Sequence, residues 1–213
     1  MTRKYTELTF TESVKQVQEH YGSRRQGAKM EAMVWPDERL SDREAAFIAD
    51  RDGFYVASVG ENGWPYMQFR GGPKGFLKVL DDRTLGFADF RGNLQYITTG
   101  NIKNDNRVAL FFMDYANRQR LKIMARAEVF DASESPDLIE QLEDPNYQAR
   151  AERAVVYHVE AFDWNCPQHI TPRWTEDELA PVIGELQARI SDLEDENERL
   201  LSGTAARQTE LIS

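Results

Sequence analysis

Cysteine and histidine are scarce in this sequence of 213 residues, which contains one cysteine and three histidines. The single cysteine, Cys166, excludes an intramolecular disulfide, and with no second cysteine to resolve it we expect an inert thiol. This composition fits a reducing compartment. The histidines have no metal-ligand spacing with one another or with Cys166, so we expect no metal site. They are His20, His158 and His169.

Long apolar runs and excess positive charge are also missing. No run approaches the roughly 20 residues that a membrane span requires. The first ten residues, MTRKYTELTF, lack the apolar core of a secretory signal. The formal net charge is −10, and a negative surface without a basic stripe repels nucleic acid. We expect a cytoplasmic protein with no membrane or nucleic-acid partner.

Motifs for nucleophilic catalysis and for nucleotide phosphates are absent. The sequence contains no G-x-S-x-G elbow, no P-loop and no G-x-G-x-x-G. Carboxylate pairs such as Asp81-Asp82 fall in turns, where we expect them to be solvated. No side chain is therefore assigned a catalytic role.

Short apolar runs separated by turn residues fill the middle of the chain. They predict six strands, with a short helix over 91–102 between the fourth and the fifth, and a closing strand. We expect a mainly β fold: a small antiparallel barrel of six or seven strands with flanking helices. The predicted strands are 54–59, 66–70, 76–80, 84–90, 107–115, 121–130 and 154–164.

Helical patterns lie on both sides of these strands. Residues 11–21 read as a helix and residues 22–29 as a loop. The capping box Ser41–Glu44 predicts a helix over about 42–51. Residues 135–153 read as helical with a break at Asp144-Pro145. We expect a small apolar group to pack on the barrel: Met30, Met33, Val34 and Trp35.

The last segment carries apolar residues at the 4-3 spacing of a coiled-coil seam. Asn197 occupies an a position of the heptad, where a buried amide fixes the register. Either this helix pairs with another or it packs on its own barrel. We predict three parts: an N-terminal helical segment (1–50), the barrel (51–174) and the heptad helix (175–213). The seam residues are Leu179, Ile183, Leu186, Ile190, Leu193, Asn197 and Leu200.

One polar segment, Asp89–Gln95, interrupts the strand pattern. It offers the guanidinium of Arg91, the small residue Gly92, two amides and the expected start of a helix. Helix N-termini and charge-assisted arginine bonds both bind anions. Arg70 on a neighbouring strand adds a second cation. The alternative is a purely structural strand-to-helix turn.

A family resemblance supports the anion site. The region from about Asp50 to Trp174 resembles the pyridoxamine 5'-phosphate oxidase-like family of FMN-binding split β-barrels. The matching features are the strand 65–70, the strand-turn-helix 85–101, the strands 108–115 and 121–130, and Ala161-Phe162-Asp163-Trp164 with Arg173 nine residues further on.

The resemblance implies a homodimer with FMN at the subunit interface. The strand Met67-Gln68-Phe69-Arg70 then follows the flavin ring and ribityl chain. The turn holds the phosphate. Residues 118–122, with Arg120 at their centre, approach from the partner subunit, and Trp164 and Arg173 close the site. The turn residues assigned to the phosphate are Asp89, Phe90, Arg91, Gly92, Asn93 and Gln95.

Two departures from the family pattern bear on the substrate. The family's Ser-Arg-Lys phosphate turn is replaced by Arg91-Gly92-Asn93, and its substrate-contacting lysine by Gly71-Gly72. We therefore expect an FMN-dependent oxidoreductase with a different, unknown small-molecule substrate. The alternatives are a non-catalytic protein that binds a flavin, a deazaflavin or haem on the same barrel, and an interaction protein that acts through its heptad helix.

Overall fold

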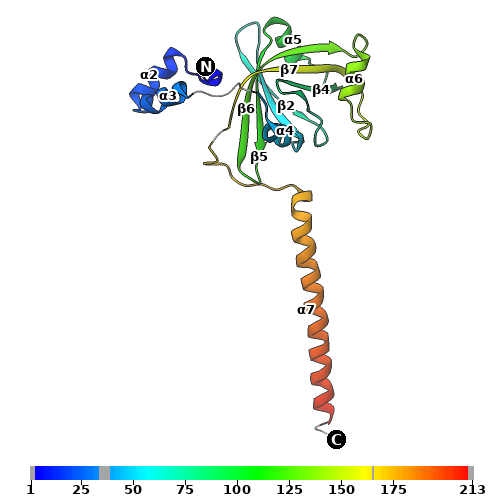
Figure 1. Ribbon diagram of the computed structural model, residues 1–213. Helices are drawn as coiled ribbons and strands as arrows, with labels where there is room; N and C mark the ends of the chain where they lie inside the picture. The colour runs from blue at the N-terminus through cyan, green and yellow to red at the C-terminus, as the bar shows by residue number, and fades with distance from the viewer. Residues whose placement is uncertain (1–2, 34–38, 165, 211–213) are drawn as a thin grey trace. The chain divides into compact units, whose positions relative to one another are not determined.

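The computed structural model describes residues 3–33, 39–164 and 166–210, with side chains as far as Leu201. The chain forms two compact units, Met1–Ile170 and Thr171–Ser213. Figure 1 shows the strands of the first unit, drawn from cyan to yellow, curled around one another, and the long helix of the second.

The first unit is built on one seven-stranded sheet in the order β2-β1-β5-β6-β7-β4-β3. Every pairing between neighbouring strands is antiparallel. The expected fold class is thereby confirmed. The strands are β1 (Gly53–Val59), β2 (Pro65–Gly71), β3 (Lys78–Asp81), β4 (Thr84–Phe90), β5 (Arg107–Asp114), β6 (Gln119–Asp131) and β7 (Ala151–Trp164).

Alternation along the strands places one set of side chains in a common core. In β5 every second residue is buried, including Leu110 and Phe112. The ring of Phe54 from β1 stacks on Phe112 with centroids 5.2 Å apart and meets Tyr157 of β7 edge-on at 6.1 Å. Burial raises the pKa of Tyr157, so its hydroxyl stays protonated.

The N-terminal segment holds three helices: α1 (Lys4–Thr9), α2 (Glu12–His20) and α3 (Arg24–Ala32). The helix over 11–21 is confirmed, whereas the loop over 22–29 is wrong and α1 was not expected. Gly27 lies within α3, where an added Cβ would come within 2.5 Å of the Gln18 side chain. The glycine therefore allows α2 and α3 to approach closely and does not mark a loop.

Ion pairs attach α1 to the barrel. Arg3 binds Asp163, and Lys4 binds Glu160, both on β7. The apolar residues expected to pack on the barrel differ in how exposed they are. Met30 is partly buried, but Met33 is 55% exposed, so the expectation is wrong for Met33. Val34 and Trp35 lie outside the described residues.

Helix α4 (Asp42–Ala49) begins with the predicted capping box. The backbone N–H of Ser41 donates to the Glu44 carboxylate at 3.0 Å. The indole N–H of Trp164 donates to the same carboxylate at 2.6 Å. The Trp164 ring also packs against Phe47, with centroids 4.7 Å apart, and under the Arg43 guanidinium. The cap of α4 thus anchors the end of β7.

We expect Glu44 to make stability depend on pH. Burial tends to raise its pKa, but hydrogen bonds from Ser41 and Trp164 outweigh burial and hold the pKa below its usual range. Its contribution is complete above the ordinary glutamate pKa of about 4.3 and disappears as the pH falls through the lower folded-state pKa. The difference in unfolding free energy between the wild type and Glu44→Gln should therefore shrink on acidification.

Urea unfolding between about pH 6 and pH 3 measures this difference. The matched control is Glu140→Gln, at an exposed position on α6 (Pro136–Leu142). A difference for Glu44→Gln that stayed constant across this range would contradict the role assigned to the carboxylate.

The region 135–153 is helical only over α6, and β7 already begins at Ala151. The longer helix predicted here is therefore wrong. Phe130 of β6 pairs with Ala154, and Asp131 pairs with Arg153. These backbone pairings extend the closing strand beyond its apolar part, because the ladder to β6 continues where the alternation ends.

The second unit contains helix α7 (Glu176–Glu210). Thr175 and Glu178 form a reciprocal cap at its start, since the Glu178 N–H donates to Thr175 Oγ1 and the Thr175 N–H to the Glu178 carboxylate. Every α7 side chain that the structure describes is exposed. Among the described residues, no helix is long and apolar enough to cross a membrane.

Candidate functional site

The segment between β4 and the next helix has a different form from the one expected. Helix α5 (Ile97–Asn104) confirms the helix predicted over 91–102, but it begins six residues after Arg91, so the predicted start is wrong. Leu94 and Tyr96 adopt left-handed backbone angles, with φ of 63° and 52°, which a helix excludes. Asn93 accepts a hydrogen bond from the Gln95 N–H at 3.2 Å, a local turn that competes with helix formation.

Asp89, the last inward-facing residue of β4, is the centre of a buried ion-pair network. It is 3% exposed. Arg153 of β7 donates to it from Nη2 at 2.7 Å and from Nε at 3.1 Å. Arg70 of β2 lies 3.4 Å from its second oxygen. Because β2 is one edge of the sheet and β4 lies near the other, Asp89 links the two sides of the barrel.

The network leaves one donor unused. Arg70 Nε is buried and has no hydrogen-bond partner among the described residues. A buried unpaired donor costs about 1–3 kcal/mol, and more when it is charged. Burial tends to lower the pKa of Arg153, but its bonds to Asp89 and its contact with Glu152 raise it, so this cation remains charged.

A small hollow of about 50 Å³ lies over this network. A cavity of this kind needs about 10–15 Å³ to hold one water, so the hollow has room for a group of a few atoms, such as a phosphate, and not for a flavin ring. A Cβ added at Gly92 would meet no atom of the described chain within 4 Å. The hollow is lined by Gln68, Arg70, Asp89, Phe90, Gly92, Asn93, Leu94, Tyr96, Ile97, Thr99 and Arg153.

Gln68 connects β2 to helix α5. Its side-chain oxygen accepts hydrogen bonds from Thr98 Oγ1 and from the Tyr66 hydroxyl, each at 3.3 Å. A second bond joins α5 to the neighbouring strand, as Asn101 donates to the buried Ser58 of β1 at 3.0 Å. These contacts hold the start of α5 beside Arg70.

Met67 and Phe69 point to the opposite face of β2 from Gln68 and Arg70. They are 65% and 55% exposed. Phe69 contacts Tyr55 of β1 with ring centroids 5.4 Å apart. We call this surface the outer apolar face; it consists of Tyr55, Val59, Met67, Phe69 and Phe111.

The remaining predicted site residues lie elsewhere. Trp164 is at the far end of β7 from Arg153, on the order of 30 Å along the strand, and is packed on α4. Arg120 of β6 donates to the Cys166 carbonyl at 3.2 Å, and its Nε is buried without a partner in the described chain. Arg173 belongs to the second unit. Arg91 pairs with Glu152 at 3.6 Å and, like Gln95, does not line the hollow.

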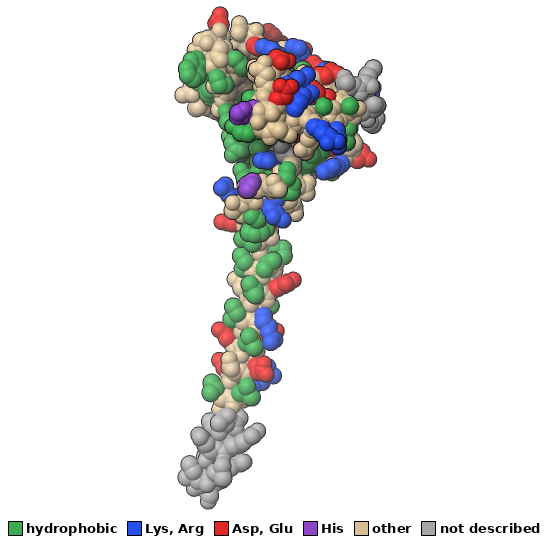
Figure 2. Space-filling view, turned by 90° about the vertical axis from the view of Figure 1, so that its left-hand side faces the viewer, with side chains coloured by type: hydrophobic (Ala, Val, Ile, Leu, Met, Phe, Trp, Pro, Cys, Tyr) green, Lys and Arg blue, Asp and Glu red, His purple; other side chains and the backbone are tan. Residues whose placement is uncertain are grey.

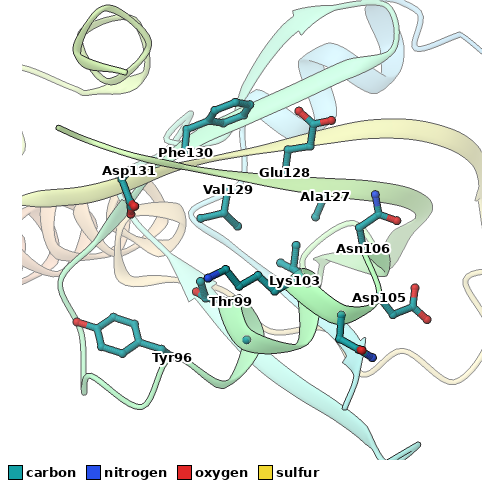
Figure 3. Close-up of a pocket in the computed structure, with 13 residues that line it drawn as sticks. Tyr96, Thr99, Lys103, Asp105, Asn106, Ala127, Glu128, Val129, Phe130 and Asp131 are labelled. Atoms are coloured by element: carbon teal, nitrogen blue, oxygen red, sulfur yellow. The ribbon is translucent and has the colours of Figure 1, made fainter. Parts of the chain in front are cut away.

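A larger open pocket of about 800 Å³ lies between α5 and β6. Figure 3 shows Val129 pointing toward Thr99 and Lys103 of α5, while Glu128 and Phe130 point away from the helix. None of the predicted cofactor-binding residues lines this pocket. Within the described chain, no group of three His, Cys, Asp or Glu residues could hold a metal ion.

The comparison with protein families covers the barrel. The family model described as "Pyridoxamine 5'-phosphate oxidase" matches residues 40–164, more than half of the chain. The chain belongs to this family. The match begins at Leu40, just before the capping box of α4, and ends at Trp164, so it spans all seven strands.

Similar solved structures are distant in sequence. HupZ of Group A Streptococcus is 15% identical over 63% of this chain and 99% of its own, with a TM-score of 0.48. A putative pyridoxamine 5'-phosphate oxidase of Lactobacillus delbrueckii is 21% identical over 59% and 94%, at 0.45. An FMN-binding protein of Syntrophomonas wolfei is 13% identical over 70% and 97%, at 0.40. No curated protein matches.

Within this pyridoxamine 5'-phosphate oxidase fold, sequence reasoning missed Arg153, the strongest partner of Asp89. The sequence pattern assigned residue 153 to a helix, and arginine at that position carries no motif. Extending the strand of β7 back from Ala154 would have placed residue 153 in a strand, but only the pairing of β7 with β4 shows that it lies opposite Asp89.

Proposed function

We propose that this member of the pyridoxamine 5'-phosphate oxidase family is an FMN-binding flavoprotein, an oxidoreductase that acts on a substrate other than pyridoxamine phosphate. The observation that carries the proposal is the hollow over Arg70, Asp89 and Arg153. It lies in the segment that the family resemblance assigns to the FMN phosphate, and it contains six of the residues predicted from the sequence.

The residues present fit a phosphate. Three guanidinium groups, those of Arg70, Arg91 and Arg153, lie around two carboxylates, Asp89 and Glu152, which leaves one positive charge unbalanced. The unused Arg70 Nε–H is a donor for a phosphate oxygen. Gly92 leaves the backbone of the loop open to close approach.

The flavin ring requires more room than this hollow provides. We propose that a second copy of the chain supplies the remaining walls, with Arg120 and its neighbours, and covers the outer apolar face. Exposed contiguous apolar surface of this kind marks an interaction site. The buried Arg120 Nε, unpartnered within the described chain, supports a ligand or partner group near this strand.

In such a site FMN supplies the redox chemistry, and the protein holds and orients it. Arg70 and Arg153 bind the phosphate, and Gln68, already fixed by Thr98, orients the chain that leads away from it. Asp89 holds both arginines in place and keeps the site from becoming strongly positive.

The substrate side differs from that of the pyridoxamine phosphate oxidases. The glycines that stand in place of their lysine are fixed by packing. A Cβ at Gly72 would come within 2.7 Å of the Phe76 ring, and one at Gly71 within 2.8 Å of the Phe69 ring. A lysine does not fit at either position without moving an aromatic ring, which supports a different substrate.

The direct test is the visible absorption spectrum of the purified protein. We expect the absorption bands of a bound flavin and, after removal of the chromophore, quenching of the fluorescence of added FMN at one equivalent per chain. Mass spectrometry of the released chromophore identifies it. A colourless protein that leaves FMN fluorescence unchanged contradicts the proposal.

The second candidate is a non-catalytic carrier or sensor of a flavin, deazaflavin or haem. It is favoured because the titratable side chains that line the hollow all have partners. Arg70, Asp89 and Arg153 form ion pairs, and Tyr96 donates a hydrogen bond to Glu152 at 3.2 Å.

Anaerobic addition of NADH or NADPH separates the two candidates. Reduction of the bound flavin, followed by reoxidation by an acceptor, favours the enzyme, and a flavin that stays oxidised favours the carrier.

A further inference from the structure

An apolar stripe runs along helix α7. Figure 2 shows its hydrophobic side chains in a row along the helix, with acidic and basic side chains beside them. Leu186 is 59% exposed and Ile190 is 55% exposed. Apolar side chains at 4-3 spacing in water require a partner surface. The stripe consists of Leu179, Ile183, Leu186, Ile190, Leu193, Asn197 and Leu200.

We propose that α7 pairs with α7 of a second copy of this chain as a parallel two-stranded coiled coil. The residue types along the stripe indicate that the partner is a second copy of α7. The a positions hold Ile183, Ile190 and Asn197, whereas every d position of the stripe holds leucine. β-branched residues at a with leucine at d favour two parallel strands over three or four.

Charge complementarity supports the same pairing. In a parallel pair, the g position of one helix faces the following e position of the other. Arg189 at g then lies opposite Glu194 at e, and the symmetry of the pair makes this contact twice. The outward positions b, c and f carry acidic residues that remain in water, among them Glu185, Asp192 and Asp195.

The irregular residues of α7 leave the seam intact. Pro181 lies within the helix at an f position, and Gly184 lies at a b position, where an added Cβ would meet no described atom within 4 Å. Both face away from the stripe. Asn197 at a meets its own copy across the axis only in the parallel, in-register arrangement, so its amide selects that register at some cost in stability.

Site-directed disulfide formation in the full-length chain tests the proposal. In a Cys166→Ser background, Leu193→Cys places a thiol at a d position, where the two copies face each other. Asp195→Cys, two residues away at the outward f position, is the matched control. Under mild oxidation at low protein concentration we expect the Leu193→Cys dimer to form about tenfold faster or more, because pairing raises the effective thiol concentration.

Charge reversal tests the register independently. Arg189→Glu in the Leu193→Cys protein should slow disulfide formation, and the further change Glu194→Arg should restore it. If Leu193→Cys and Asp195→Cys cross-link at equal rates, α7 is not paired in this way. If charge reversal has no effect while Leu193→Cys cross-links, the pair is not parallel and in register. Titration of FMN with the same variants reports on the barrel, so failure of α7 pairing and failure of the FMN proposal are separate results.

Discussion

Replacing Asp89 with asparagine should lower the free energy of unfolding of the barrel by about 3–5 kcal/mol. The substitution preserves the size of the side chain but removes the negative charge that Arg70 and Arg153 share. Two largely buried guanidinium groups, with side chains 20% and 11% exposed, are then left close together, and only the Glu152 carboxylate remains beside Arg153 in the described chain. Urea or thermal unfolding of the purified variant measures the loss.

The matched control is Asp82→Asn, which breaks an ion pair of similar length on the surface. Asp82 lies 2.7 Å from Arg39, and both side chains are about half exposed. Exposed pairs contribute about 0–1 kcal/mol, so this variant should be nearly as stable as the wild type.

Adding Arg153→Gln to Asp89→Asn should recover part of the lost unfolding free energy, because it removes one uncompensated charge. Equal effects of Asp89→Asn and Asp82→Asn would mean that the network is solvated.

Arg70→Gln should weaken FMN binding by about 10- to 100-fold. A hydrogen bond to a charged group contributes about 1.5–3 kcal/mol, and each 1.4 kcal/mol changes a dissociation constant tenfold. Quenching of flavin fluorescence on titration with protein measures the change. Riboflavin, which lacks the phosphate, should lose much less affinity than FMN if Arg70 binds that group.

Two variants provide controls for Arg70. Arg126→Gln, on β6, removes an exposed arginine that pairs with Glu160 and should leave FMN affinity unchanged. Arg91→Gln removes the cation that the sequence favoured, whose side chain is 56% exposed and outside the hollow. We expect a smaller loss for Arg91→Gln than for Arg70→Gln. Equal losses for FMN and riboflavin in Arg70→Gln would place Arg70 at the ring or ribityl chain instead of the phosphate.

Local sequence patterns were sufficient to predict a helix or strand where its formation does not depend on which element packs beside it. The alternation around Phe54 and Phe112 predicts strands because one face of each is buried, whichever strands lie beside it. Ser41–Glu44 caps a helix through bonds within four residues. Gly27 shows the limit of such reasoning: it reads as a loop residue, but the structure uses it where α2 and α3 touch.

The candidate site was predictable only in part. The sequence pattern reveals a cation, an anion and a small residue near a strand end, which are Arg70, Asp89 and Gly92. The start of α5 was placed six residues too early, because the left-handed turn at Leu94 and Tyr96 depends on contacts such as the bond from Tyr96 to Glu152. Arg153 was missed because its role depends on the strand that lies opposite it, β4, and the sequence pattern does not identify that strand.

The sequence by itself determined the fold class, the 4-3 spacing of apolar residues along α7 and the polar segment after β4, since these depend on periodicity and on short-range bonds. Only the tertiary structure decided which arginines pair with Asp89, that the Arg70 face of β2 and not the Phe69 face lies toward Asp89, and that Trp164 packs on the cap of α4. Those outcomes depend on strand register and on closure of the sheet, which bring together residues as far apart in the chain as Arg70 and Arg153.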